Sequence, residues 1–199
     1  MNYSIIIPLY NESPNIDALY EELTTVIEKN LNHDRNFELI YIDDGSTDDT
    51  FNKLLKLEKK NFNIKIIRNK KNLSQSESMN NGINNSNYDN LIFLDGDGQN
   101  DPKDIDKMLI EYEKGNDLVH GIRVKRKDNF FTKTLPSLIA NYIVRLISKS
   151  KIIDHGCSLK IIKKNLLDKK ILWGDFHRLL VARLNFDKIN IVQIETNHR

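Results

Sequence analysis

The sequence has a single cysteine, Cys157, among its 199 residues. One cysteine excludes an intramolecular disulfide and a zinc site built from several thiolates, and it is typical of a reducing compartment. No apolar run approaches the roughly 20 residues of a membrane-spanning helix. The first residues show neither the basic segment nor the cleavage site of a secretory leader. We therefore expect a cytoplasmic protein.

Several nucleotide-binding and metal-binding motifs are also missing. The P-loop pattern GxxxxGK[ST] does not occur, and the first apolar run leads into PLYNESP, where a dinucleotide-binding fold needs GxGxxG. An EF-hand loop that began at Asp95 would need glycine and glutamate where this chain has Asn100 and Asp106. These absences exclude P-loop, dinucleotide-binding and EF-hand proteins.

Charge is unevenly distributed, although the net charge is only +2. Residues 1–119 contain 13 Lys and Arg against 22 Asp and Glu, whereas residues 120–183 contain 15 against 4. An acidic region attracts metal ions, and a basic region attracts phosphates, nucleic acid or an anionic lipid surface. The two halves of the chain are thus expected to bind different partners.

Apolar runs rich in β-branched residues alternate with helical patterns over the first 124 residues. This order predicts a mostly parallel α/β sheet with helices on both faces. We expect one domain over residues 1–199, since a chain of this length can bury one core. The predicted strands are 3–10, 37–45, 63–69, 90–94 and 117–124, and the predicted helices are 14–27, 48–60, 74–86 and 101–115.

Polar clusters follow three of these strands, namely YNE (10–12), DDGSTDD (43–49) and DGDGQND (95–101). Ligands of parallel sheets bind beyond the carboxyl ends of the strands, so the three clusters are expected to meet at one edge. Some of these carboxylates have a structural interpretation as well. Asp101 is expected to cap the helix that follows it, with Asp104 completing a capping box.

The acidic residues Asp95 and Asp97 and the amide of Gln99 occupy alternate positions after a strand. In an extended segment alternate side chains point the same way, so three oxygens could face one centre. Hard cations such as Mg²⁺ or Mn²⁺ prefer oxygen ligands and bridge to phosphates. Gly96 and Gly98 would allow a ligand close to the backbone. A solvated turn remains the alternative interpretation.

The basic second part of the chain has a different pattern. Residues 128–150 mix Phe, Leu and Ile with Lys and Arg, which predicts one or two amphipathic helices lying on a bilayer interface. The segment GCSLKIIKKNLLDKK is expected to be a short strand or turn that leads into a basic helix. GDFHRLLVARLNF is expected to form another helix, and KINIVQIET a last strand.

Three motifs, IIIPLYNE, YIDDGSTDDT and FLDGDGQNDP, occur in this order and at this spacing. Together they resemble the family-two glycosyltransferases of GT-A (Rossmann-like) fold. The later segments DHGCSLK, GDFHR and TNHR resemble the subgroup of dolichyl-phosphate mannosyltransferase and its bacterial polyprenyl-phosphate counterparts. The resemblance implies a nucleotide-sugar-binding part at 1–124 and an acceptor and membrane-surface part at 125–199.

The resemblance also assigns roles to individual residues of the donor site. Pro8, Tyr10 and Glu12 would line the nucleotide pocket, while Ile42 and Asp44 would contact the base and ribose. Asp43 is then left to form the turn. The sugar diphosphate and a Mg²⁺ or Mn²⁺ ion would bind at the third motif, with Asp95, Asp97 and Gln99 as metal ligands and the sugar diphosphate at Asp95, Gly96, Asp97 and Gln99.

Two basic residues complete the expected catalytic set with Asp97. Arg123 ends the fifth predicted strand and would meet the donor phosphates. Lys133 would receive the phosphate of the acceptor. The roles of Asp154, Lys160, Asp175, His177 and Arg178, which lie in the subgroup segments, are left open.

The resemblance implies a metal-dependent inverting glycosyltransferase that moves a sugar from a nucleotide-diphosphate sugar to a polyprenyl phosphate. The alternatives are transfer to a glycan or lipid hydroxyl, and a non-catalytic sugar-nucleotide-binding subunit. A nucleotidyltransferase is disfavoured because YNESPN is neither glycine-rich nor basic. Since such proteins commonly continue beyond the position of Arg199, a separate membrane-anchor subunit is a further expected partner. No nucleic acid partner is expected, and the protein would lie at the cytoplasmic face of a membrane.

Overall fold

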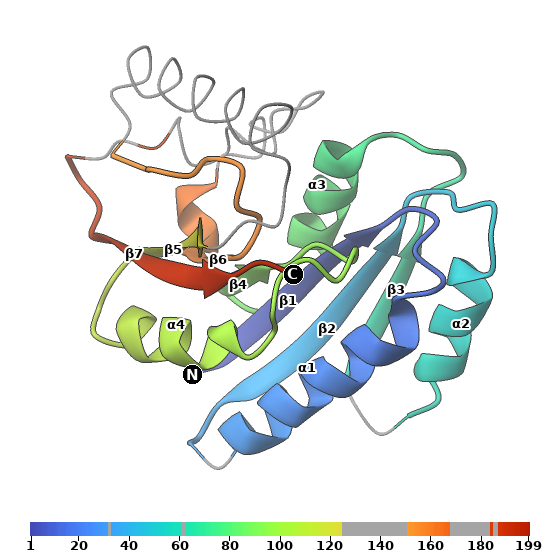
Figure 1. Cartoon of the computed structure of the whole chain (residues 1–199), viewed down its shortest axis with the longest axis horizontal. Helices are drawn as coiled ribbons and strands as arrows, with labels where there is room; N and C mark the ends of the chain where they lie inside the picture. Colours follow the sequence, from blue (N-terminus) through green and yellow to red (C-terminus); the bar gives the residue numbers. More distant parts are fainter. Residues whose placement is uncertain (32, 61–62, 125–150, 168–183, 185–186) are drawn as a thin grey trace.

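A computed structural model of the chain describes residues 1–31, 33–60, 63–124, 151–167, 184 and 187–199. Its centre is a seven-stranded sheet with the order β3-β2-β1-β4-β6-β5-β7 (Figure 1). Every neighbouring pair is parallel except the two pairs that include β6. The predicted mostly parallel α/β sheet is therefore confirmed. The strands are β1 Asn2–Leu9, β2 Asn36–Asp43, β3 Ile64–Arg68, β4 Asn90–Phe93, β5 Leu118–Val124, β6 Lys160–Lys163 and β7 Ile191–Asn197.

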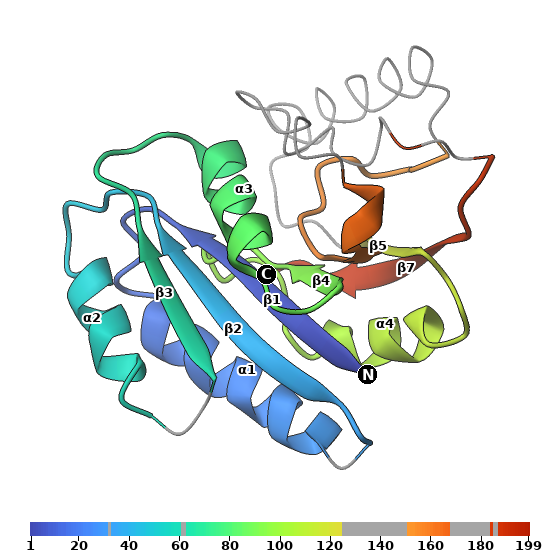
Figure 2. The same ribbon diagram turned by 180° about the vertical axis from the view of Figure 1, so that it is seen from behind.

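Helices cover both faces of the sheet, as Figures 1 and 2 show from opposite sides. The first face packs against α1 (Ile16–Leu31), α2 (Thr50–Leu57) and α4 (Asp104–Tyr112). The other face packs against α3 (Gln75–Asn85) and the segment around the short 3₁₀ helix η2 (Lys164–Leu166). Among the described residues, no helix combines the length and apolarity that crossing a bilayer would require.

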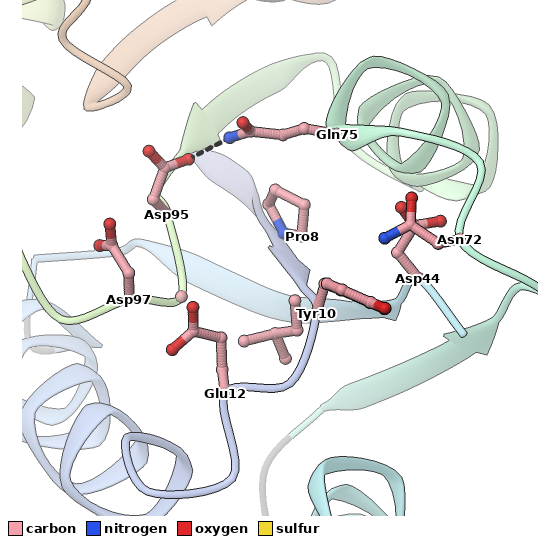
Figure 3. A pocket seen from close by; sticks show the side chains of 10 residues that line it. Pro8, Tyr10, Glu12, Asp44, Asn72, Gln75, Asp95 and Asp97 are labelled. Carbon is pink, nitrogen blue, oxygen red and sulfur yellow. Dashed lines mark hydrogen bonds between the residues drawn. The ribbon is translucent and has the colours of Figure 1, made fainter. Parts of the chain in front are cut away.

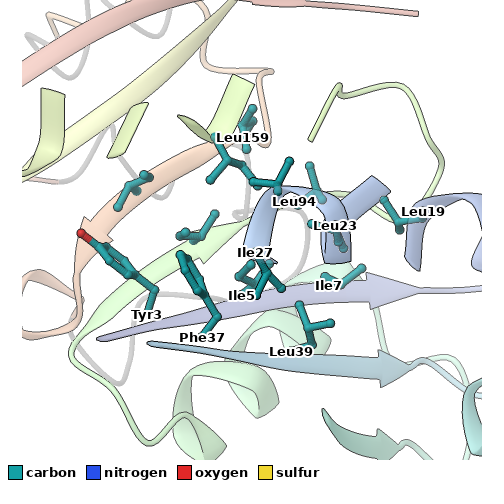
Figure 4. Packing of buried hydrophobic residues seen from close by; sticks show 14 of the residues in the cluster. Tyr3, Ile5, Ile7, Leu19, Leu23, Ile27, Phe37, Leu39, Leu94 and Leu159 are labelled. Carbon is teal, nitrogen blue, oxygen red and sulfur yellow. The ribbon is translucent and has the colours of Figure 1, made fainter. Parts of the chain in front are cut away.

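The central strands are buried on both faces. Alternate residues of β1 divide between two apolar clusters, since Ile5 and Ile7 pack beneath α1 whereas Ile6 packs beneath α3. Figure 4 shows the first cluster, in which Leu23 and Ile27 of α1 lie over these strand residues. Near-continuous apolar runs are the sequence pattern of such doubly covered strands.

One detail of the sequence prediction, at the start of α4, changes in the structure. Asp101 Oδ1 does accept a hydrogen bond from the backbone N–H of Lys103 at 3.0 Å, ahead of α4. The capping box with Asp104 is wrong, because Asp104 Oδ2 instead accepts from the backbone N–H of Asn197 in β7 at 2.6 Å. The predicted amphipathic helices at 128–150 lie outside the described residues.

Helix α3 approaches the sheet closely at a glycine. A Cβ atom placed on Gly82 would lie 2.5 Å from Ile6 Cγ2 and 3.0 Å from Ile42 Cδ1. Both isoleucines are completely buried, so neither side chain has free space into which it could move. Gly82 thus sets the height of α3 above the sheet and, with it, the position of the first residues of the helix.

Gly82→Ala is expected to lower the free energy of unfolding by about 1–3 kcal/mol, because the added methyl group overpacks the core. This loss outweighs the gain of roughly 1 kcal/mol that alanine brings to a helix interior. Urea unfolding of both proteins measures the difference. The exposed Asn84 of the same helix offers the control, since Asn84→Ala should stabilise slightly; a stabilised Gly82→Ala would contradict the close packing.

Candidate active site

A pocket of about 290 Å³ opens at the carboxyl ends of β1, β2 and β4. The structure thus brings together members of the three polar clusters that the sequence places after these strands. Figure 3 shows Asp95 and Asp97 at one end of the pocket and Asp44 and Asn72 at the other. The residues that line it are Pro8, Leu9, Tyr10, Glu12, Asp44, Asn72, Gln75, Asp95, Gly96 and Asp97.

The carboxylate of Asp95 is held from two sides. Gln75 Nε2 donates a hydrogen bond to Asp95 Oδ1 at 2.6 Å, and the Ser158 hydroxyl also hydrogen-bonds the carboxylate. Ser158 Oγ in turn accepts from Asn100 Nδ2 at 2.7 Å. Burial raises the pKa of Asp95 and the charge of Asp97 adds to the shift, while Ser158 and the nearby cations oppose it. Asp95 is therefore a rigidly placed carboxylate in a partly desolvated position.

The backbone after Asp95 turns instead of continuing as a strand. Residues 96–98 form a turn in which Gly98 has a φ of 73°, and Asp97 Oδ1 accepts from the backbone N–H of Gln99 at 3.0 Å. The expected extended geometry, in which alternate side chains of this segment face one centre, is therefore wrong. The structure leaves Gln99 exposed and outside the pocket lining, whereas Asp97 lines the pocket.

Gly96 also differs from its expected role. A Cβ atom at this position would lie 2.0 Å from Leu9 Cδ2 and 3.2 Å from the carbonyl oxygen of Pro8. The space beside Gly96 is thus filled by the protein itself, although the residue still lines the pocket. The glycine is required because the turn packs directly against the end of β1.

Glu12 supplies a further carboxylate to the pocket. One of its oxygens accepts from Asn15 Nδ2 at 2.6 Å. Burial raises the pKa of Glu12; the hydrogen bond from Asn15 opposes this shift, and the charges of Asp97 and Asp48 add to it. Repulsion among carboxylates of this kind is relieved by a cation.

The carboxylate oxygens of this pocket suit a hard divalent metal ion that binds together with a phosphate ligand. No three His, Cys, Asp or Glu side chains within the described ranges are arranged to hold a metal ion by themselves. Asp95 and Asp97 nevertheless offer the oxygen ligands that Mg²⁺ and Mn²⁺ prefer, and such ions commonly take their remaining ligands from phosphates and water. The two carboxylates therefore fit a metal that arrives with a phosphate.

The two aspartates of the second motif have different partners. Asp43 accepts from the backbone N–H of Ser46 at 3.0 Å and lies 3.1 Å from Arg68 Nε, so it stabilises the turn. Asp44 lines the pocket, as expected for a ligand-binding residue. Ile42 is absent from the pocket lining, because its completely buried side chain packs beneath Gly82 of α3. Pro8 and the 43% exposed Tyr10 both line the pocket.

Arg123 forms an ion pair with Asp154, a residue whose role the sequence analysis left open. Its Nε and Nη2 atoms donate to the two carboxylate oxygens of Asp154, both at 2.8 Å. The pair lies outside the pocket lining, yet the charge of Arg123 lowers the pKa of Asp95. Arg123 is thus a fixed cation behind Asp95, and Lys133 lies outside the described residues.

A second buried cation lies beside Asp95. Lys160, the first residue of β6, is 3% exposed, and its Nζ lies 6.0 Å from the centroid of the Phe93 ring. Burial lowers the pKa of Lys160, while the nearby Asp95 and Asp154 oppose that shift. No role could be assigned to Lys160 from the sequence, because its closeness to Asp95 depends on β6 pairing beside β4.

Sequence reasoning also missed the pocket residues Asn72 and Gln75. Asn72 lies in the connection between β3 and α3, to which the sequence analysis assigned no structure, and Gln75 is the first residue of α3, within the predicted helix 74–86. The one available signal is Ser74, a residue type that caps helices and therefore places Gln75 in the first turn. Which way that turn faces depends on long-range packing.

Asp154→Ala is expected to destabilise the fold by about 3 kcal/mol, because it removes the acceptor of two guanidinium hydrogen bonds in a poorly solvated position. The control is Glu22→Ala, which removes one of the two carboxylate partners of the more exposed Arg199 and should cost below about 1 kcal/mol. Denaturant unfolding compares the two variants. Equal losses would show that Arg123 does not depend on Asp154.

Comparisons with known proteins agree with this geometry. The sequence pattern described as Glycosyl transferase family 2 matches residues 4–174. The dodecaprenyl-phosphate galacturonate synthase of Rhizobium johnstonii is 34% identical over 184 residues, which are 92% of this chain and 54% of that protein. The chain thus spans about half the length of this curated relative.

Solved structures share the fold at low sequence identity. Glucosyl-3-phosphoglycerate synthase from Mycobacterium tuberculosis, in complex with Mn²⁺, UDP-glucose and phosphoglyceric acid, has a TM-score of 0.67 at 15% identity, covering 100% of this chain and 72% of that one. TarS 1–349 from S. aureus, in complex with UDP-GlcNAc, has a TM-score of 0.64 at 19% identity, covering 100% and 59%. The motifs at the strand ends, the match over residues 4–174 and the shared architecture show that the chain belongs to glycosyl transferase family 2.

Proposed function

We propose that the protein is a glycosyltransferase that moves a sugar from a nucleotide-diphosphate sugar to a polyprenyl phosphate. The observation that carries the proposal is a pocket with Asp44 at one end and with Asp95 and Asp97 at the other. Such a pocket suits an elongated ligand with a nucleoside at one end and a sugar diphosphate at the other. The name of the Rhizobium relative supports a polyprenyl-phosphate acceptor.

The donor would bind with its base and ribose near Tyr10 and Asp44 and its diphosphate near Asp95 and Asp97. Mg²⁺ or Mn²⁺, when bound by these last two carboxylates, would neutralise charge on the departing nucleoside diphosphate. The Mn²⁺ and UDP-glucose complex of the mycobacterial enzyme supports this arrangement. Arg123 would add a fixed positive charge on the same side of the pocket.

The acceptor determines what the chain has to supply. A polyprenyl phosphate is already an anion near neutral pH, so its oxygen can attack the anomeric carbon without a general base. The bond from that carbon to the donor diphosphate breaks, the configuration inverts, and the nucleoside diphosphate leaves with its electron pair. The side chains then need only to align the two substrates and to balance charge, which is the part we assign to Asp97, Arg123 and Lys133.

The basic part of the chain supports a lipid acceptor. We infer that residues 1–124 bind the donor and that residues 125–199 receive the acceptor at the cytoplasmic face of a membrane. The excess of Lys and Arg in residues 120–183 would attract an anionic bilayer, by roughly 1 kcal/mol for each basic residue near the surface. A membrane anchor, within a longer chain or on a separate subunit, would keep the enzyme at that surface.

The acceptor class is tested by offering radiolabelled UDP-sugars with a short-chain polyprenyl phosphate, the matching polyprenol or an oligosaccharide. We expect label to appear only in the lipid phosphate, together with stoichiometric release of UDP. Transfer to the polyprenol or the oligosaccharide would favour the hydroxyl-acceptor alternative. Tight UDP-sugar binding without transfer to any acceptor would favour a non-catalytic subunit.

Asp97→Asn is expected to lower the transfer rate by about 100-fold or more while the fold survives, because the variant keeps the shape of the side chain but loses a charged ligand. Initial rates over a Mg²⁺ and Mn²⁺ series measure the effect. Asp101→Asn is the matched control, since asparagine also caps a helix well and Asp101 does not line the pocket. Near-normal turnover of Asp97→Asn at saturating metal would contradict the metal assignment.

A further inference from the structure

Gln75 is the first residue of α3, and it lines the pocket directly opposite the end of β4. Its Nε2 donates to Asp95 Oδ1 at 2.6 Å, the hydrogen bond drawn in Figure 3. The amide comes from the layer of α3, whereas Asp95 follows β4 at the edge of the sheet. The contact therefore joins two layers of the fold at the carboxylate assigned to the sugar-diphosphate end.

The backbone before Gln75 is held in an unusual conformation. Ser74 has a φ of 129°, a region that residues with a side chain rarely adopt, and such a residue costs of order 1–3 kcal/mol. Ser74 Oγ accepts from the backbone N–H of Glu77, which begins the helix in this orientation. The strained residue immediately precedes the side chain that reaches Asp95.

The carboxylate of Asp44 stabilises this conformation. Asp44 Oδ1 accepts from the backbone N–H of Leu73, and Oδ2 accepts from that of Ser74, both at 3.0 Å. Asn69 Nδ2 donates to Asp44 Oδ1 at 2.7 Å, and Asn69 Oδ1 accepts from Asn81 Nδ2 of α3 at 2.8 Å. Asp44 thus hydrogen-bonds Asn69 at the start of the connection between β3 and α3 and Ser74 at its end. Asn69 in turn hydrogen-bonds the helix itself.

We propose that Gln75 is a positioning residue of the transfer site, which fixes the Asp95 carboxylate in the orientation that binds the metal ion of the donor complex. Hydrogen bonds from Asp44 hold the backbone up to Ser74, and the next residue, Gln75, bonds Asp95, so the two ends of the pocket are connected through this short segment. The inference rests on the proposed function. Its chemistry follows from the rule that a ligating carboxylate needs a hydrogen-bond donor to hold its direction.

The expected effect follows from losing one such donor. Removal of an outer hydrogen-bond partner typically costs 10- to 100-fold in metal affinity or activity. Gln75→Met keeps the length of the side chain but cannot donate to Asp95. We therefore expect Mn²⁺ affinity in the presence of UDP to fall by about 10- to 100-fold, while UDP affinity without metal changes by less than about 3-fold.

The experiment measures both affinities on the complete chain. Mn²⁺ binding is followed by electron paramagnetic resonance with and without UDP, and UDP binding by isothermal titration calorimetry in the presence of a chelator. Asn84→Met is the matched control, because Asn84 is an exposed amide on the same helix that does not line the pocket. Thermal unfolding of both variants shows whether α3 remains folded.

We expect Gln75→Met to lose Mn²⁺ affinity selectively, whereas the control variant should bind Mn²⁺ as tightly as the wild type. Mn²⁺ affinity equal to that of the control would overturn the proposal. A parallel loss of metal-free UDP affinity would also overturn it, since Gln75 would then act on the nucleotide or on the fold. A wild type without Mn²⁺ binding would count against it too. Failure of the wild type to glycosylate polyprenyl phosphate would refute the proposed function but leave this binding comparison valid.

Discussion

The parallel pairing of β1 with β2 and with β4 determines where chemistry can occur in this protein. The three strands are buried on both faces, so polar side chains within them need a partner, as Ser4 and Glu38 are to each other. Polar side chains that are open to a ligand occur where the strands end. Parallel strands end at the same edge. Tyr10, Asp44 and Asp95 consequently meet in one pocket, although 85 positions of sequence separate the first from the last.

The charges around Asp95 are arranged in layers. Carboxylates of Glu12, Asp95 and Asp97 face the pocket, whereas the cations Lys160 and Arg123 lie behind Asp95 and outside the lining. A bare diphosphate would meet repulsion from these carboxylates, which a divalent ion would offset. The metal–diphosphate complex that we propose would therefore suit this distribution of charge better than the diphosphate alone.

The sequence was most informative where structure depends on local pattern. Apolar runs predicted the strands and their common edge, because burial on both faces is visible within each run. The sequence was misleading at Gln99, because an extended segment was assumed where the positive φ of Gly98 turns the chain. It was also misleading at Ile42, because this buried position on β2 faces α3. The importance of Gln75 and Lys160 could not be predicted, since each approaches Asp95 only through the placement of α3 or β6.

The direction of β6 has a consequence for how the fold can be varied. Because β6 runs antiparallel between β4 and β5, its first residue and the last residue of β5 lie at the same edge as the pocket. Both attachment points of the connection from residue 125 to residue 159 therefore lie beside the pocket. Its described end also contacts the site, since Asp154 pairs with Arg123 and Ser158 hydrogen-bonds Asp95. An exchange between homologues that spares residues 151–159 would keep these contacts and the pairing of β5 with β6, so the rest of the connection is a place where the scaffold could be varied next to its pocket.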